Sequence, residues 1–169
     1  MNGHPGGEEH TRRMIELAGL PAGASVLDLG AGAGDAVRLL HALGYEAKGI
    51  DLAPRGENVT QGDLLHTPYP DGSFDAVLSQ CAFCVSGDAD AALREAYRLL
   101  KRGGVLLLSD VCFTDVTKAA ETAGFTVVHR EDMTDTWREY YIEAIWRGES
   151  CTVPVKGKCT YEMLIGRKG

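Results

Sequence analysis

The residues of this chain best suited to bind a charged ligand form a glycine-rich stretch after a short apolar run. Residues 24–29 predict a buried strand, and Gly30-Ala31-Gly32-Ala33-Gly34 predicts a tight turn that opens a helix at Asp35. A dinucleotide-binding loop reads G-x-G-x-x-G and brings a pyrophosphate to the helix N-terminus. Here Asp35 stands in place of the third glycine, and its carboxylate would repel a pyrophosphate. The loop therefore favours a ligand that carries positive charge.

Acidic side chains at the ends of two predicted strands support that interpretation. Asp28 lies near the end of strand 24–29, and Asp51 follows the strand predicted at 46–50. An acid about 20 residues beyond the glycine loop is where ribose hydroxyls are held, since a carboxylate accepts from both at once. A plain strand–helix turn, and an Asp that starts a turn before Pro54, are the alternatives. Loop and acid together favour S-adenosylmethionine (SAM), which has no phosphate and carries a positive sulfonium.

The stretch 26–110 resembles class I SAM-dependent methyltransferases. Residues 28–34 match their first motif, Asp51 matches their ribose-binding acid, and Gln61-Gly62-Asp63-Leu64 matches the segment whose Asp contacts the adenine. Phe74-Asp75-Ala76-Val77 matches their fourth strand, and Leu99-Leu100-Lys101-Arg102-Gly103-Gly104 matches the segment before the fifth, with Arg102 in place of Pro. The resemblance implies a SAM pocket formed by Asp28, Gly30, Ala31, Gly32, Gly34, Asp51, Leu52, Asp63, Leu64 and Ser79.

One departure from that family concerns the adenine side of the pocket. Only eleven residues separate Asp51 from Asp63, where the family usually has a full helix. We therefore expect a loop at this place. Adenine packing is then expected to rest on Leu52 and Leu64.

A closer resemblance lies in Ser79-Gln80-Cys81, in segment 93–100 and in Ser109-Asp110-Val111. These segments resemble the core of arsenite methyltransferases, in which a cysteine follows the fourth strand. Gly6-Gly7 and Thr11-Arg12-Arg13 also resemble small uncharacterised bacterial methyltransferases. The resemblance implies that Cys81 lies nearest the transferred methyl group. A thiolate or metalloid acceptor would need little base, whereas Gln80 or Asp110 could orient an oxygen or nitrogen acceptor. The candidate catalytic residues are Cys81, Gln80 and Asp110.

The chain has five cysteines, and each lies close to the end or the start of a predicted strand. In the methyltransferase family the last strand is antiparallel and lies beside the fifth, so its start meets the ends of the others. The thiols expected on the face where the methyl group is delivered are Cys81, Cys84, Cys112, Cys151 and Cys159. Soft thiolates bind metalloids, zinc or copper(I). The alternative is that each cysteine is a small buried apolar residue.

Strands alternate with helices along the chain, which predicts a Rossmann-like, doubly wound α/β sheet with helices on both faces. The resemblance implies seven strands, mostly parallel, with the last antiparallel. Strands are expected at 24–29, 46–50, 58–61, 74–79, 105–109, 125–129 and 161–166. Helices are expected at 8–18, 35–43, 88–100, 115–123 and 133–146. Gly103-Gly104 is expected to end the third of these helices, 88–100. We predict one domain, 1–169, with an N-terminal helix within 1–20 and a substrate-side helix and loop within 131–159.

Several side chains have a structural interpretation beside a functional one. The aromatic side of helix 133–146, formed by Trp137, Tyr140 and Tyr141, is typical of core, yet it could also cover a substrate. His66 lies in a Pro-rich loop and is expected to be a polar group on the surface. His4, His10, His41 and His129 show no pairing at metal-ligand spacing.

Composition limits the kind of partner. A net charge of −7, with no clustered Lys/Arg face, argues against a nucleic-acid backbone or an anionic membrane as the main partner. An odd number of cysteines and no secretion signal predict reduced thiols and a cytoplasmic location. The sequence predicts a SAM-dependent methyltransferase for a small-molecule acceptor, and leaves its oligomeric state open. The alternative is a non-catalytic SAM-binding module or metalloid sensor that partners a larger enzyme; a dinucleotide oxidoreductase is disfavoured by Asp35.

Overall fold

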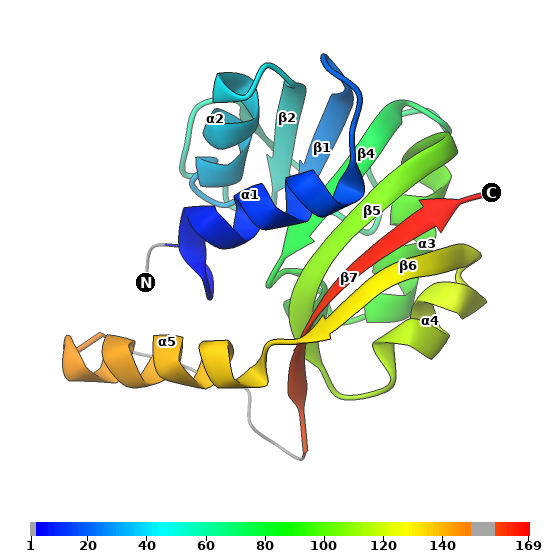
Figure 1. Ribbon diagram of the computed structural model, residues 1–169. Coiled ribbons are helices and arrows are strands. Elements are labelled where there is room, and N and C mark those ends of the chain that lie inside the picture. Colours follow the sequence, from blue (N-terminus) through cyan, green and yellow to red (C-terminus); the bar gives the residue numbers. More distant parts are fainter. Residues whose placement is uncertain (1–2, 150–157) are drawn as a thin grey trace.

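A computed structural model describes residues 3–149 and 158–169. Those residues form a twisted seven-stranded sheet with helices on both faces (Figure 1). The strand order is β3-β2-β1-β4-β5-β7-β6, and only β7 runs antiparallel to its neighbours. The strands are β1 Ser25–Leu29, β2 Glu46–Asp51, β3 Val59–Gln61, β4 Phe74–Gln80, β5 Leu100–Cys112, β6 Phe125–Asp132 and β7 Thr160–Lys168. The helices are α1 Gly7–Ala18, α2 Asp35–Ala42, the 3₁₀ turn η1 Phe83–Val85, α3 Ala89–Leu99, α4 Val116–Thr122 and α5 Thr134–Trp146. The predicted fold class is confirmed.

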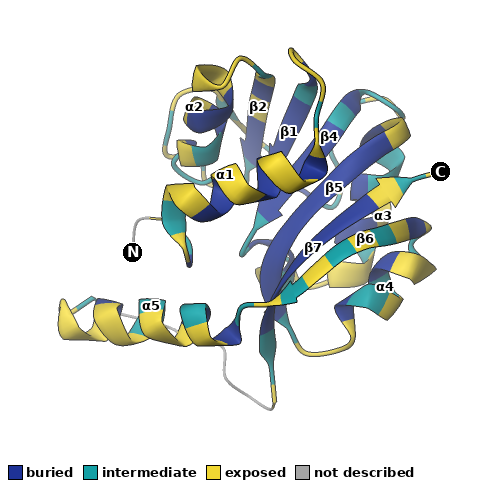
Figure 2. Cartoon of the chain, in the orientation of Figure 1, coloured by how far each residue is buried: buried dark blue, intermediate teal, exposed yellow. Residues whose placement is uncertain are grey.

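The sheet is buried on both faces because its central strands carry apolar side chains in both directions (Figure 2). Along β5, Leu106 and Leu108 pack with α3 and α4, whereas Val105 and Leu107 pack with α1 and α2. This alternation follows from the two-residue period of a strand. Burying each such side chain contributes about 1.5–3 kcal/mol, so the carboxyl ends of the central strands are held in fixed positions.

The end predicted for the third helix, 88–100, was wrong. α3 ends at Leu99, and Leu100 already has an extended backbone and pairs with Phe74 of β4. Gly103-Gly104 does not end a helix but lies inside β5, where the β4–β5 register shifts. Gly103 takes φ +74°, a conformation that glycine adopts without strain. The glycine pair therefore marks a bulge in a long strand.

The region between β2 and β3 has no helix, as its short length predicted. Residues 52–58 form turns that pack closely on the glycine loop: a Cβ added at Gly56 would lie 2.0 Å from the carbonyl oxygen of Ala33. Only glycine allows this approach. The adenine side of the predicted pocket is therefore bordered by a loop.

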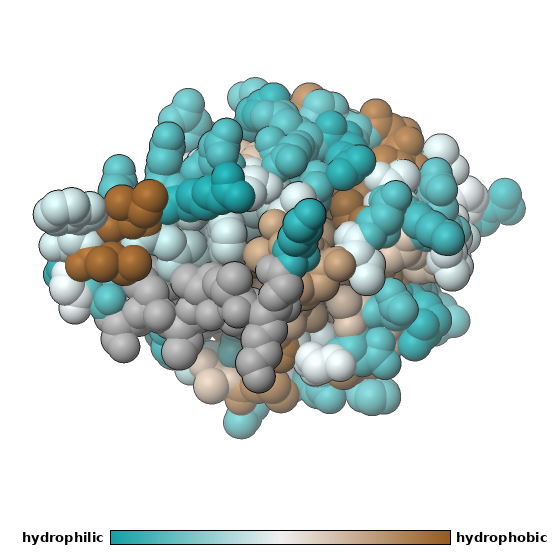
Figure 3. Space-filling model, turned by 90° about the horizontal axis from the view of Figure 1, so that it is seen from below, coloured by the Kyte–Doolittle hydropathy of each residue, from teal (hydrophilic) through white to brown (hydrophobic). Residues whose placement is uncertain are grey.

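Helix α5 leaves the sheet at the carboxyl edge and runs below α1 (Figure 1). Trp137 packs with Val111 and Tyr161, and the Tyr140 hydroxyl donates to the carbonyl of Gly3 at 3.2 Å. Further along, Ile142, Ile145 and Trp146 are exposed, and hydrophobic surface lies over this outer end in Figure 3. No helix within the described residues is long and apolar enough to cross a bilayer.

Candidate functional site

A cavity of about 340 Å³ lies at the carboxyl ends of β1, β2 and β4. Its wall includes eight of the ten predicted cofactor residues and two of the three predicted catalytic ones. These are Asp28, Gly30, Ala31, Gly32, Asp51, Leu52, Asp63, Leu64, Gln80 and Cys81. Ligands of open α/β sheets bind at the carboxyl ends of the strands, next to the point where the strand order changes direction. In this sheet that point lies beside β1. The structure therefore brings residues from five separate segments to one cavity.

The glycine loop is shaped by close contacts that exclude side chains. Gly30 takes φ +84°, and a Cβ there would lie only 2.2 Å from the Cβ of Ala82, which follows β4. Gly32 takes φ +52°, and its N–H donates to Asp51 Oδ2 at 2.9 Å. Gly34 is the N-cap of α2 at φ +75° and does not line the cavity. Bare backbone thus forms one wall.

Asp51 is fixed at the tip of β2 by two backbone donors. Its Oδ2 accepts from Gly32, and its Oδ1 accepts from the N–H of Ala53 at 2.9 Å. Each carboxylate oxygen retains capacity for a second donor. A carboxylate fixed in this way on the cavity wall can accept from the two hydroxyls of a ribose.

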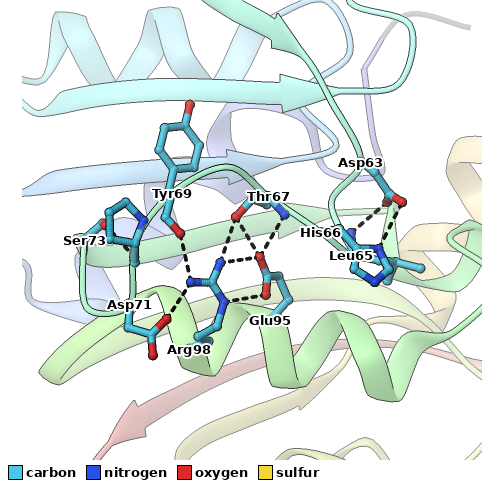
Figure 4. Close-up of polar contacts among 10 residues, drawn as sticks. Asp63, Leu65, His66, Thr67, Tyr69, Asp71, Ser73, Glu95 and Arg98 are labelled. Atoms are coloured by element: carbon cyan, nitrogen blue, oxygen red, sulfur yellow. Dashed lines mark hydrogen bonds and ion pairs between the residues drawn. The ribbon is translucent and has the colours of Figure 1, made fainter.

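The loop that carries Asp63 and Leu64 is fastened to α3 by the ion pair of Glu95 and Arg98 (Figure 4). Glu95 Oε1 accepts from the N–H and hydroxyl of Thr67 at 2.9 and 2.7 Å. Arg98 donates to Glu95 and to the carbonyl of Tyr69 at 2.8 Å. Both members of the ion pair therefore hold the loop: Glu95 binds Thr67, and Arg98 binds the carbonyl of Tyr69. Sequence reasoning missed these two residues, although the segment 93–100 was singled out.

Asp28 and Asp51 place two carboxyls on the same cavity. The pKa of Asp28 is raised to about 7, first by burial and secondly by the negative charge of Asp51. A cation in the cavity would favour the ionised form of Asp28, since an opposite charge stabilises a carboxylate. The electrostatics fit a positively charged ligand, as the sequence indicated.

Ser79 and Cys81 lie two residues apart but have different surroundings. The buried Ser79 hydroxyl donates to the carbonyl of Leu29 at 2.9 Å and does not line the cavity. Cys81 lines it, with φ +56° and its Sγ 3.4 Å from the hydroxyl of Tyr161. A non-glycine residue in this region is strained, and such residues cluster at functional sites. Burial raises the pKa of the Cys81 thiol to about 12, so the thiol is protonated at neutral pH.

The end of β4 is tied to the N-terminal segment by side chains far apart in sequence. Gln80 Oε1 accepts from the Thr11 hydroxyl at 3.2 Å, and Gln80 Nε2 lies 3.3 Å from His4 Nδ1. His4 also lines the cavity. Sequence reasoning missed both His4 and Tyr161, because no local pattern indicates contacts across 76 and 80 residues.

Three of the four described thiols, Cys81, Cys84 and Cys159, pack against one cluster of Val111, Trp137 and Tyr161, and the five-thiol site stays a prediction. Among the described residues, no three His, Cys, Asp or Glu side chains are placed to hold a metal ion. Cys81 lines the first cavity, whereas Cys84 and Cys112 line a second one of about 210 Å³. Cys159 packs with Trp137 and Tyr161. Strand alternation turns Cys112 to the opposite face of the sheet from Val111. Cys151 lies outside the described residues.

Asp110 is nearly fully buried and lines the second cavity. Its Oδ2 accepts from the N–H groups of Phe83 and Cys84 at 2.8 and 3.1 Å, and its Oδ1 accepts from Val111 at 2.7 Å. Burial raises its pKa. These bonds hold η1 between the two cavities, so the geometry favours an anchoring role for Asp110.

Residues 27–108 match a family model described as "Methyltransferase domain". This core belongs to the methyltransferase family, which confirms the resemblance inferred from the sequence. A demethylmenaquinone methyltransferase of Thermus thermophilus is 38% identical over 113 residues, which are 57% of this chain and 51% of that protein. An arsenite methyltransferase of Aquipseudomonas alcaligenes is 36% identical over 114 residues, 53% of this chain and 33% of that protein. The chain thus spans about half the length, or less, of these curated relatives.

The whole architecture recurs in solved methyltransferases. Phosphoethanolamine N-methyltransferase 2 of Haemonchus contortus, in complex with S-adenosyl-L-methionine, superposes with a TM-score of 0.78 at 19% identity. The match covers 98% of this chain and 53% of that one. At this identity the likeness demonstrates the fold. It extends to β6, α5 and β7, which lie beyond the matched sequence family.

Proposed function

We propose that this protein binds SAM and transfers its methyl group to a small-molecule acceptor. The observation that carries the proposal is the Asp51 carboxylate, fixed by the N–H of Gly32 on a cavity that the buried Asp28 also lines. Backbone glycines and two acids suit a ligand with a ribose and positive charge, and the family match supports the same cofactor.

Each predicted cofactor residue has a place in this proposal. Asp51 accepts from the ribose hydroxyls, Asp63 accepts from the adenine amino group, and Leu52 and Leu64 cover the ring. Asp28 lies near the positive groups, and residues 30–32 form the backbone wall. Gly34 and Ser79 act indirectly, because Gly34 starts α2 and Ser79 binds the carbonyl of Leu29.

SAM supplies an electrophilic methyl on a sulfonium, and the protein's task is to align the acceptor with it. Positioning of this kind can supply much of the rate enhancement of a displacement. Gln80 and Cys81 lie where β4 meets the cavity, so they border the reacting atoms. Asp110 positions this end by holding η1.

The acceptor chemistry we favour from the cysteines is a thiol or a metalloid bound beside Cys81. Cys81 is the described thiol on the cofactor cavity, and Trp137 and Cys159 pack nearby against Tyr161. The region 131–159 is proposed to border the acceptor within one domain, and α5 is the helix of this region. Alkylation of Cys81 in the SAM-bound protein tests this: As(III) should protect the thiol, and zinc serves as the comparison. Full alkylation with As(III) present would remove the metalloid acceptor.

Calorimetry tests the cofactor. SAM and S-adenosylhomocysteine should bind and NAD should not. Asp51→Ala should weaken SAM binding by about 1.5–3 kcal/mol, since it removes hydrogen bonds to a charged group. Asp51→Asn is the matched control, because it keeps one acceptor oxygen and should lose less. Unchanged affinity in Asp51→Ala would remove the ribose assignment.

A second candidate is a SAM-binding module without catalysis. The observation in its favour is that burial holds the Cys81 thiol protonated, and a thiol is a weaker nucleophile and ligand than a thiolate. Release of S-adenosylhomocysteine from labelled SAM, with acceptors of different classes, separates the two candidates. Tight SAM binding with no turnover for any class would favour the module.

A further inference from the structure

The N-terminal segment adds an imidazole to the cofactor cavity. His4 lines it together with Gln80 and Cys81, on the side where β4 ends. The segment is held there by the bond from Tyr140 to Gly3 and by the contacts of His4 with Thr11 and Gln80. An imidazole at this place faces the region that the proposed function assigns to the acceptor.

Three side chains form a closed ring of hydrogen bonds around this imidazole. Thr11 Oγ1 donates to Gln80 Oε1 at 3.2 Å, Gln80 Nε2 lies 3.3 Å from His4 Nδ1, and His4 Nε2 lies 3.1 Å from Thr11 Oγ1. His4 Nδ1 also lies 3.1 Å from the carbonyl oxygen of Pro5. When the proton of a neutral His4 is on Nε2, Nδ1 accepts from the Gln80 amide and its lone pair points toward the end of β4. Once Nδ1 gains a proton, the carbonyl of Pro5 is placed to accept it in a hydrogen bond.

The surroundings keep that imidazole neutral. Burial lowers the pKa of His4, and the hydrogen bond with the Pro5 carbonyl and the charge of Asp35 oppose this effect only in part. The titratable groups that face it come from three sides. They are Glu8, His10 and Arg12 of α1, Asp35 and Arg38 of α2, and Asp28 and Cys81 across the cavity. A neutral imidazole next to a methyl donor is able to take up a proton at physiological pH.

His10 of α1 lies beside His4 and is buried outside the cavity. It is 4% exposed, and its ring lies 6.1 Å from that of His4. Neither ring nitrogen has a hydrogen-bond partner among the described residues. A buried polar group without a partner is costly, and such groups call for a specific explanation. Burial lowers the pKa of His10 to about 4, so it adds no positive charge beside His4 at neutral pH.

We propose that His4 takes the proton of a protic acceptor, X–H, during methyl transfer. This inference rests on the proposed function. The long bond from Gln80 Nε2 to His4 Nδ1 is replaced by one from X–H, and the freed amide holds the acceptor. As the X–CH₃ bond forms, the S–CH₃ bond breaks and its electron pair stays on sulfur. The X–H proton moves to His4 Nδ1, leaving a neutral methylated product, S-adenosylhomocysteine and an imidazolium. The acceptor class is thus a hydroxyl or a thiol rather than a group that is already ionised.

The experiment uses the full chain, SAM, and two probes: catechol for O–H and dithiothreitol for S–H. His4→Gln can keep a bond to Thr11 but cannot take up a proton. We expect it to lower kcat by at least about 100-fold while the KM for SAM stays within about threefold. Wild-type kcat should rise with pH as His4 loses its proton, and this rise should vanish in His4→Gln. His129→Gln, on β6, is the matched histidine control.

A separate readout covers probes that are bound but not turned over. With S-adenosylhomocysteine present, the His4 Cε1–H resonance should shift when a probe is added, and its titration should move. No shift with either probe overturns the inference, as does an unchanged kcat in His4→Gln. A raised KM for SAM with unchanged kcat would instead assign His4 to the cofactor. Failure of the wild type to bind SAM would overturn the proposed function itself.

Discussion

The proposed cofactor side and the proposed acceptor side of the site are built in different ways. On the cofactor side, Asp28, the glycine loop, Asp51 and Asp63 come from 36 consecutive residues, 28–63. Backbone N–H groups satisfy the carboxylates of Asp51 and Asp63. On the acceptor side, His4, Cys81 and Tyr161 meet from distant parts of the chain. Local backbone geometry forms the first side, and tertiary packing of side chains forms the second.

The two sides also differ in strain and polarity. The acceptor side holds Cys81 at positive φ and His10 without a hydrogen-bond partner among the described residues. Local strain of this kind costs about 1–3 kcal/mol per residue and persists only where surrounding structure enforces it. Where backbone groups form the binding wall, the structure is built with little strain. The strained backbone at Cys81 requires support from the rest of the fold.

The largest effect is expected where the glycine loop meets the residue after β4. Gly30→Ala should destabilise the fold by about 3 kcal/mol or more, from left-handed strain plus overpacking against Ala82. Gly44→Ala is the matched control, because Gly44 has a similar φ of +85° and open space around it. Chemical denaturation gives both values. The double variant Gly30→Ala/Ala82→Gly should recover the overpacking part; no recovery would contradict the assigned contact.

A pH effect should follow from Asp28. Its pKa of about 7 means that the carboxyl gains a proton as pH falls through 7, whereas a bound cation favours the ionised form. SAM affinity should therefore fall with decreasing pH, by up to about tenfold per unit below 7, because binding releases a proton. Calorimetry in buffers of different ionisation enthalpy counts that proton. Asp28→Asn should abolish the dependence, and an unchanged slope in this variant would assign it elsewhere.

A smaller effect is expected at the clamp between α3 and the adenine loop. Arg98→Ala removes the donors to Glu95 and to the carbonyl of Tyr69, so Asp63 is held less firmly. SAM affinity should fall by about fivefold, the size of one ordinary hydrogen bond, with kcat unchanged. Arg98→Lys keeps the charge and should lose less. A change in kcat without a change in affinity would place the effect on the acceptor side.

An effect of similar size concerns strain at Cys81. Cys81→Ala removes the thiol and keeps a Cβ on the left-handed backbone, whereas Cys81→Gly removes both the thiol and the Cβ that strains this backbone. The glycine variant should be more stable than the alanine variant by about 1 kcal/mol, since glycine adopts φ +56° freely. Thermal unfolding of the pair measures the difference. If alanine is the more stable, the positive φ is not a source of strain.

Sequence reasoning predicted the sheet, its last antiparallel strand and the segments around the cofactor, because these depend on local patterns. It misjudged the end of α3, since a glycine pair can form a bulge as well as a helix stop. Its grouping of the thiols stays a prediction: Cys81, Cys84 and Cys159 pack against one cluster, whereas Cys112 packs on the other face of the sheet. His4 was not assigned to the site, since its contacts with Thr11 and Gln80 depend on how α1 packs. The spacing of residues along the sequence does not indicate contacts of this kind.

The place of β7 between β5 and β6 has a consequence for folding during synthesis. In the sheet, β5 and β6 are joined through β7. This strand comes after β5, β6 and α5 in the chain. Until β7 leaves the ribosome, β5 and β6 each expose an unpaired edge, and such edges invite association with other chains. The strands of the cofactor half, β1 to β4, all come before β5 in the chain. Methyl-donor binding could therefore begin on a nascent chain, while the acceptor side is completed last.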